Sequence, residues 1–573
     1  MKKIILITSL ILFSVLFAET SSFRNLATGT AIDDDLDLIY DPIDLHFVSG
    51  NRLYTNLSNV INGNEKILDN DSSDQYLLGF SLQSPFLENL KHSILIEFAN
   101  SKFGQYVHLD TELNGSFDMY GYGEIENIFT SYDDIDGDGI YDIISSNTQN
   151  KKRYEDNNLL RFVLNNSTVW NDLICGLRID VTKDIDKETL LYELDQTEYQ
   201  MADEYNSFDL IEDDDEIMVT KSLDLDLLFS VMNPDFKGYE LRGNLMLGYT
   251  NHDVSSQDIY YDSSETYNPE VTNYLSYDEE KSDNEFDDNT SGLESGIGAS
   301  LRKSLAESEE RKNDSYWLVG TQLNFGFYNY EYENINQNNN ITTFYDGFDT
   351  LSTDYLMETV NINTTTTKGD QWMVDYDIFS RYNFQLDEKV YLGIGAKLNY
   401  KFTKETYDEV DEIDNSENYL QNDQVSDEND YNVTETYLEE SDITSETATT
   451  DLMLPVGLEY KFTRNNKWAV RFGASFYNRY RVHNHSKQVT NADPIVIITE
   501  YGDETSTVEI EDNTYSSYSN QSKTTLSSTN YYYGVGFEPT KKLQIDFVGL
   551  FDLDHDTLQD FVQSLKMSFT LKF

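Results

Sequence analysis

The chain alternates apolar and polar residues over segments of about ten residues. The clearest segment places Tyr239, Leu241, Gly243, Leu245, Leu247 and Tyr249 on one face and Glu240, Arg242, Asn244 and Thr250 on the other. A period of two is expected of a β-strand whose two faces meet different surroundings. Similar segments recur from near residue 75 to the C-terminus, and a weaker one spans about 44–54. The pattern predicts an all-β protein.

The connections between these segments alternate in length. Short links occur near 85–90, 168–172, 233–238, 385–388, 463–466 and 539–542, with a longer one at 303–314. Stretches rich in Asp, Glu, Asn, Ser and Thr lie near 103–157, 183–221, 252–292, 331–371, 403–447 and 483–527. Short turns on one side and long loops on the other are typical of outer-membrane barrels. We therefore predict a transmembrane antiparallel β-barrel over residues 44–573 with about 16 strands (14 being the next choice), long acidic extracellular loops and short periplasmic turns.

The first eighteen residues have the pattern of a signal peptide. Lys2 and Lys3 precede an apolar run from Ile4 to Phe17, and Ala18 is a small residue at the expected cleavage point. No later apolar run is long enough for a transmembrane helix. We expect residues 1–18 to be removed on export.

The C-terminal residues also indicate an exported protein. Leu565, Met567, Phe569, Leu571 and Phe573 alternate with polar residues, and the chain ends on an aromatic ring. This segment resembles the C-terminal strand by which outer-membrane barrels are recognised for assembly. The resemblance implies a bacterial outer-membrane location and the barrel-assembly machinery as a partner.

The composition limits the kinds of molecule that the protein can bind. The formal charge is -64, from 104 acidic and 40 basic residues, which excludes the basic surface that nucleic-acid binding needs. The 42 Tyr and 31 Phe are too many rings for a disordered acidic chain, and they suit aromatic girdles at the two membrane surfaces. We expect contacts with outer-membrane lipid, lipopolysaccharide and small-molecule solutes. The oligomeric state stays open.

Residues 24–45, RNLATGTAIDDDLDLIYDPIDL, resemble the start of mature long-chain fatty-acid transporters of the outer membrane. In that family a small-residue stretch is followed by acidic residues and a turn, which here is Asp41-Pro42-Ile43. The resemblance implies that residues 19–43 occupy or cap the lumen at its periplasmic end, and that the substrate is hydrophobic. A flexible acidic tail is the alternative.

Charged residues of both signs occupy the strand faces that point away from lipid. Such groups require water or close pairing, because isolated charges are costly to bury. A water-filled, porin-like channel for passive diffusion of small solutes is the first hypothesis. A closed lumen filled by paired charges is the alternative to an open pore, and a fatty-acid-transporter-like carrier and a non-transporting surface or adhesion barrel are the other functions. The candidate pore-lining residues are Arg161, Arg178, Arg242, Asp375, Asp377, Arg381, Lys397, Glu459, Arg471 and Arg479.

The sharpest local motif lies in the first long stretch. Alternating carboxylates with intervening glycines can wrap a Ca²⁺ ion in oxygen ligands, and the segment resembles calcium loops of the EF-hand and thrombospondin type. It departs from the EF-hand at Ser145, where a glutamate is expected. The expected ligands are Asp134, Asp136, Asp138, the Ile140 carbonyl and Asp142.

No other cofactor and no enzymatic activity is predicted. The seven histidines form no recognisable nucleophile or metal motif. Asp554-His555-Asp556 is the one local group that a surface hydrolase could use, and exposed polar residues in a loop explain it as well.

Overall fold

The computed structural model describes fifteen stretches of the chain. They are residues 22–57, 73–84, 89–103, 123–133, 143–200, 206–268, 274–306, 311–346, 355–387, 389–421, 430–462, 467–502, 506–511, 517–551 and 566–573. The expected signal peptide (1–18) and the expected calcium ligands Asp134, Asp136, Asp138, Ile140 and Asp142 lie outside these stretches.

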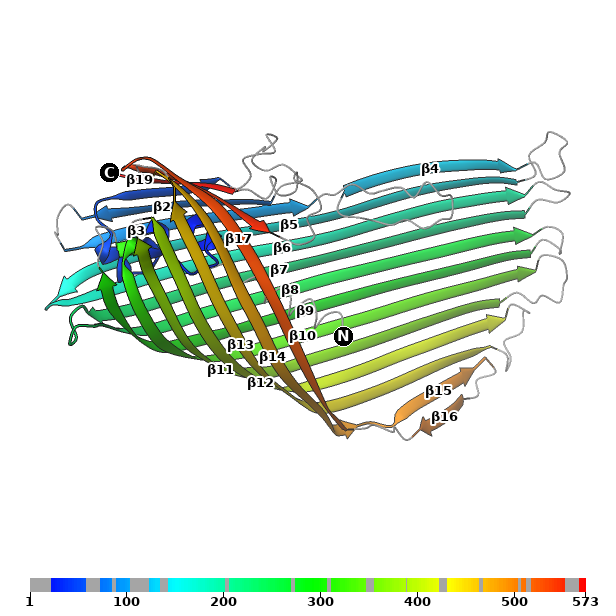
Figure 1. Cartoon of the computed structure of the whole chain (residues 1–573). Coiled ribbons are helices and arrows are strands. Elements are labelled where there is room, and N and C mark those ends of the chain that lie inside the picture. The colour runs from blue at the N-terminus through cyan, green and yellow to red at the C-terminus, as the bar shows by residue number, and fades with distance from the viewer. Residues whose placement is uncertain are drawn as a thin grey trace.

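Antiparallel pairing closes the strands into a ring. In ring order the strands are β1 to β3, β5 to β14 and β17 to β19, and β1 pairs with β19 from Arg52↔Lys572 to Leu57↔Met567. This all-β barrel of sixteen ring strands, counted over the described residues, confirms the predicted fold class. Figure 1 shows the ring at one end of the molecule. No helix in the described stretches is long and apolar enough to cross a membrane.

The strands differ greatly in length around the ring. The shorter ones are β1 (Arg52–Leu57), β2 (Ser73–Gln83), β3 (Lys91–Phe103), β18 (Leu543–Phe551) and β19 (Lys566–Lys572). The longer ones are β5 (Ile143–Trp170), β6 (Leu173–Gln200), β7 (Asn206–Asn233), β8 (Glu240–Asn268), β9 (Tyr274–Ala306), β10 (Ser315–Asp346), β11 (Tyr355–Asp387), β12 (Val390–Gln421), β13 (Tyr431–Lys461), β14 (Trp468–Ala492) and β17 (Tyr518–Thr540).

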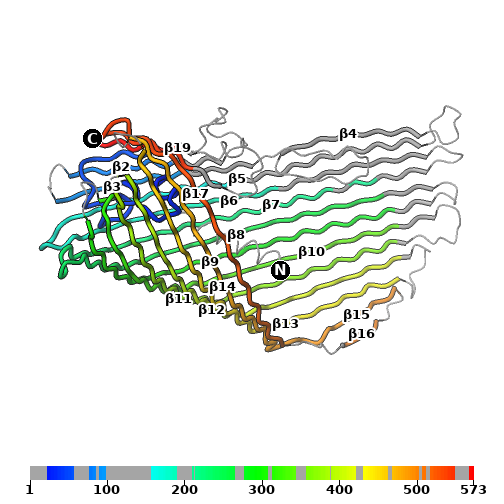
Figure 2. Tube along the Cα trace, in the orientation of Figure 1, coloured from blue at the N-terminus to red at the C-terminus, as the bar shows by residue number. Residues whose placement is uncertain are grey.

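Three further strands lie outside the ring. β4 (Gly123–Asp133) pairs with the upper part of β5, β15 (Ile495–Tyr501) with the upper part of β13, and β16 (Ser506–Glu511) with β15. Together with β5 to β13 they form a curved sheet that continues far beyond the ring, as the uninterrupted trace in Figure 2 shows for β7 to β13. We call this sheet the extension.

The extension corrects the prediction of long loops. The described parts of 103–157, 183–221, 252–292, 331–371, 403–447 and 483–527 are largely strand. Polar residues occupy both faces of most of this sheet, so no continuous apolar face is required and the alternation that marks a half-buried strand fades. β-branched residues still favour the extended backbone, as in Thr364 to Thr367 on β11.

The apolar outer face marks how much of each strand spans the membrane. On β10 the outward residues run from Trp317 to Phe327, whose side chains are 37% and 65% exposed, and Asn329 and Glu331 follow. Eleven residues are enough for a tilted transmembrane strand, whereas the 32 residues of β10 extend about 100 Å. Tyr249 and Trp372 end the apolar face on β8 and β11, and Tyr480 lies one outward position below its last residue, Val482, on β14. We call these upper rings, with Phe327 and Phe402, the girdle.

Short helices lie inside the base of the ring. They are α2 (Phe23–Ala27), α3 (Asp35–Tyr40) and the 3-10 helix η1 (Asp44–Phe47), and a second 3-10 helix, η3 (Arg311–Asn313), lies between β9 and β10. Residues 44–47, expected as the start of a strand over 44–54, instead form η1, and the first strand begins at Arg52. We call residues 22–48 the plug segment.

Candidate functional site

The plug segment is built from short turns closed by its own polar groups. The Ser22 hydroxyl accepts a hydrogen bond from the Asn25 N–H at 3.1 Å, which caps α2. The Asp37 carboxylate accepts from the Asp34 N–H at 2.6 Å and from the Ser22 hydroxyl at 2.9 Å, so the start of α3 is tied to the start of α2. Gly29 has a φ of 62°, which suits the reversal after α2. The segment therefore folds back on itself within the lumen.

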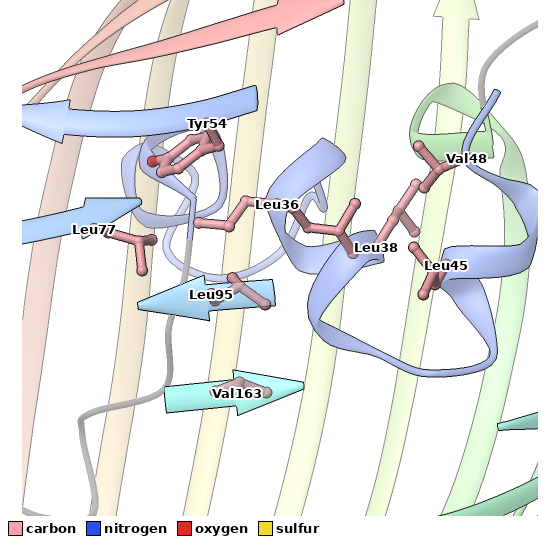
Figure 3. Close-up of a cluster of buried hydrophobic side chains, with 9 residues drawn as sticks. Leu36, Leu38, Leu45, Val48, Tyr54, Leu77, Leu95 and Val163 are labelled. Atoms are coloured by element: carbon pink, nitrogen blue, oxygen red, sulfur yellow. The ribbon is translucent and has the colours of Figure 1, made fainter. Parts of the chain in front are cut away.

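Apolar side chains anchor the second half of the plug segment to the wall. Leu36, Ile39 and Leu45 are fully buried. Figure 3 shows Leu36, Leu38, Leu45 and Val48 of the plug segment facing four wall residues. Burial of this kind stabilises by about 1.5–3 kcal/mol for each large side chain. The wall residues of the cluster are Tyr54 on β1, Leu77 on β2, Leu95 on β3 and Val163 on β5.

Wall glycines let the first half approach closely. Gly393, Gly457 and Gly473 are paired in register across β12, β13 and β14, which leaves a stripe without side chains on the inner wall. A Cβ at Gly457 or Gly473 would collide with the backbone of Thr28, and one at Gly393 with the carbonyl of Ala31. The stripe therefore fits the turn between α2 and α3, and larger residues there would exclude it.

Carboxylates of the plug segment pair with basic residues around the ring. Asp41 accepts from Arg242 at 2.8 Å, and Asp44 lies 3.0 Å from both Arg242 and Arg311. Asp35 lies 3.4 Å from Arg52 and 3.6 Å from Lys572, and Asp33 pairs with Arg381. The basic partners come from β1, β8, β11, β19 and the β9–β10 connection. The ion pairs thus reach the segment from several sides of the lumen.

In α2 the signs of the charges are reversed, because a basic residue of the plug segment pairs with an acidic residue of the wall. Arg24 donates to the Glu459 carboxylate from Nε at 2.8 Å and from a terminal nitrogen at 3.0 Å. Arg471 donates to the same carboxylate at 2.7 Å and to Asp546 at 2.5 Å. These four side chains are at most 4% exposed. Because each charge is buried, removal of one member would leave its partner uncompensated.

Tyr40 joins the plug segment to β5 and β6. Its hydroxyl donates to Asp180 at 2.9 Å and contacts Arg161, which also pairs with Asp180 at 2.7 Å. The guanidinium carbons of Arg161 and Arg178 lie 5.1 and 4.7 Å from the centre of the Tyr40 ring. The ring therefore has cation–π contacts with two wall arginines.

Titration of the plug segment follows from its burial and its partners. Burial, with a further contribution from the charge of Asp33, raises the pKa of Asp37 to about 7 despite hydrogen bonds from Ser22 and Asp34. Burial alone would also raise the pKa of Asp44, but Arg242 and Arg311 outweigh it and hold that pKa well below its ordinary value. Asp44 is thus an anion at every physiological pH, whereas Asp37 titrates near neutrality.

Five of the ten predicted pore-lining residues contact the plug segment, and a sixth reaches it through one of these five. They are Arg161, Arg178, Arg242, Arg381, Glu459 and Arg471. Of these, Arg471 reaches it through Glu459.

The other four pair within the inner wall. Lys397 lies 3.4 Å from Asp377, Asn399 donates to Asp377 and to Asp375, and Arg479 pairs with Asp451 at 2.7 Å.

The sequence pattern did not predict the plug-segment residues that pair with these wall residues. The pattern predicts an acidic segment that contains Asp33, Asp35, Asp41 and Asp44 but none of their ion-pair partners, and it gives Arg24 no special role. A usable signal existed, since the aspartates alternate with the apolar Leu36, Leu38 and Ile39 in a way that a flexible tail does not require. Wall residues Arg52, Arg311 and Lys572 were missed because they lie at strand ends or in a connection. Within the described stretches no group of three or more His, Cys, Asp and Glu side chains could hold a metal ion.

Comparison with known proteins adds little to this description. No family model matches the sequence, and no curated protein matches it. Solved structures with some likeness include the siderophore receptor PiuA from Acinetobacter baumannii (8% identity, TM-score 0.25, covering 92% of this chain and 82% of that chain). Two others are the ferripyoverdine receptor of the Pseudomonas aeruginosa outer membrane (8%, 0.23, 91% and 72%) and the copper transporter OprC (7%, 0.22, 91% and 80%). Scores this low support no conclusion about function, and the resemblance to fatty-acid transporters stays a prediction.

Proposed function

We propose that the chain is a bacterial outer-membrane transport barrel whose lumen is closed at rest by the plug segment. The outward apolar face that ends at the girdle supports placement in a membrane. The short connections lie at the end of the ring that holds the plug segment, which fits the periplasmic side. Solute crosses when the plug segment leaves its place.

One observation carries the proposal: the plug segment contacts the wall around the ring. Its first half lies on the glycine stripe of β12 to β14, and its second half packs on β1, β2, β3 and β5. Ion pairs add β8, β11 and β19. A segment held from opposite sides narrows the lumen at this level, which weighs against a permanently open porin-like channel.

The charged inner wall also bears on the substrate. Lys397, Asp377, Arg479 and Asp451 face the lumen above the plug segment, where a purely apolar duct would place no charge. These pairs favour hydrated small solutes over the hydrophobic compounds that the N-terminal resemblance implies. Uptake of a labelled fatty acid by cells that express the protein would reverse this preference.

Conductance in planar bilayers tests the proposal. The protein without its signal peptide is compared with a variant that lacks residues 23–48, and both are checked for a heat-modifiable, folded barrel on gels. We expect rare openings for the complete chain and steady ohmic conductance for the deletion variant. Steady conductance of the complete chain would contradict the closed resting state. Lack of conductance in both would favour the non-transporting surface barrel.

A further inference from the structure

A groove crosses the outer face of β9 to β13 directly above the girdle. Its volume is about 760 Å³. Tyr330, Gly369, Tyr407 and Ile443 are paired in register across four strands and form its floor. Outward-facing neighbours of these residues supply the walls, among them Asn289, Asn329, Asp370, Thr406, Asp408 and Asp442.

The register places this groove at the height of the outer-leaflet head groups. On β10 the last apolar outward residue is Phe327, and the next one, Asn329, lines the groove. On the outer face of β11, Asp370 is the next residue above Trp372. The Trp372 ring lies 5.1 Å from the Phe402 ring on β12. Aromatic rings of barrels mark the boundary between hydrocarbon and head groups. A groove one residue pair above them therefore opens onto the polar part of the lipid.

The lining selects between two kinds of head group. Its carboxylates, from Asp370, Asp408 and Asp442 among others, are hydrogen-bond acceptors, and they repel a phosphate. The lining holds one basic residue, Lys368, which is paired with Glu331. Phosphate recognition relies on clustered Lys and Arg, whereas sugar hydroxyls donate to carboxylates and accept from amides such as Asn289 and Asn329.

We propose that this groove binds the saccharide of an outer-leaflet glycolipid. The inference rests on the membrane placement in the proposed function and does not depend on transport. The hydroxyls of one or two sugar rings donate to the carboxylates, and the acyl chains lie on the apolar face below Phe327 and Trp372. The strongly acidic outer surface then meets an uncharged part of the lipid, so its charge is no obstacle to close contact.

Retention of glycolipid in nanodiscs tests the groove. The complete folded barrel is placed in phosphatidylcholine discs with digalactosyldiacylglycerol, a glycolipid whose sugar head group carries no charge, and bound lipid is measured by native mass spectrometry. Thr406→Trp fills the groove, and the double variant D370A/D408A removes two acceptors. The matched control is Val482→Trp on β14, the first outward residue above Tyr480, which neither lines the groove nor pairs with a residue that does.

We expect both groove variants to retain about tenfold less glycolipid than the unaltered protein, as the loss of two or more hydrogen bonds implies. The control should retain it fully. Equal retention by all four proteins would overturn the proposal, as would displacement of the glycolipid by phosphatidylglycerol, which would show that phosphate is the recognised group. A chain that fails to enter discs, or runs identically with and without boiling, would instead refute the membrane placement.

Discussion

The base of the barrel and the extension are made of the same strands but are stabilised differently. At the base, the plug segment covers the inner wall, and the Arg24, Glu459, Arg471 and Asp546 side chains are at most 4% exposed. In the extension polar residues occupy most of both sheet faces, and Val508 on β16 is 62% exposed. The base depends on close fit and desolvated charges, and the extension on its backbone hydrogen bonds. Substitutions should therefore change the stability and the conductance of the barrel strongly at the base and only slightly in the extension.

The largest effect is expected at Glu459. Glu459→Ala leaves the buried Arg24 and Arg471 guanidiniums without their shared carboxylate. Breaking a buried ion pair in this way costs about 3–5 kcal/mol. Hydrogen exchange of residues 23–31 should rise strongly, and openings in planar bilayers should become frequent. Glu459→Gln, which keeps an acceptor, should be milder; equal exchange in the alanine variant and the unaltered protein would refute the role of this pair.

A steric change at the glycine stripe should rank second. Gly457→Val places a side chain where the Thr28 backbone lies. Overpacking of this kind costs about 1–3 kcal/mol, so the turn after α2 is displaced. Gly243→Val is the matched control, since its outward Cβ would meet open space. Limited proteolysis should cut the plug segment faster in the first variant only, and similar cutting in both would argue against the stripe as its seat.

The third prediction uses pH. A carboxyl group whose pKa is raised by docking binds more protons when docked, so docking weakens as pH rises from the ordinary pKa of 3.8 toward about 7. The slope is on the order of 1 kcal/mol per pH unit in this range. Openings of the complete chain should become more frequent between pH 5 and pH 7. Asp37→Asn should lack most of this dependence, and a variant with an unchanged pH profile would show that another group titrates.

The smallest effect is expected at the start of the extension. Lys221 on β7 lies 3.7 Å from Asp253 on β8, and their side chains are 53% and 40% exposed. Exposed pairs contribute less than about 1 kcal/mol. Lys221→Ala should leave the thermal transition of the barrel, and its conductance, almost unchanged. A loss comparable to that of Glu459→Ala would erase the distinction between the two regions.

The sequence predicted the barrel well because the alternation of apolar and polar residues follows directly from the position of the wall. A wall between lipid and an interior of different polarity requires alternation, and segments such as 239–250 show it directly. The alternation also predicted that Arg161, Arg242 and Glu459 face away from lipid, and each of them contacts the plug segment in the structure. It could not show what those side chains contact, because pairing between Arg24 and a residue 435 positions away leaves no local trace.

The extension was missed for the opposite reason. Strands with polar residues on both faces need no two-residue period, so polar, Asn-rich stretches such as 331–346 resemble loops by composition. Their strand structure comes from neighbours of equal length: β10 pairs with β9 and β11 from end to end, with one register shift at its base. Such cooperative pairing is a property of several strands together, and no single segment reveals it.

The unbroken ladder has a mechanical consequence. Between Phe327 and Asp346, β10 rises about 60 Å along its axis with no bend or bulge in its pairing. A load applied at the far end is shared in shear by the hydrogen bonds of many parallel rows, and no hinge absorbs it. A force on the far end of the extension is therefore transmitted to the strands that surround the plug segment.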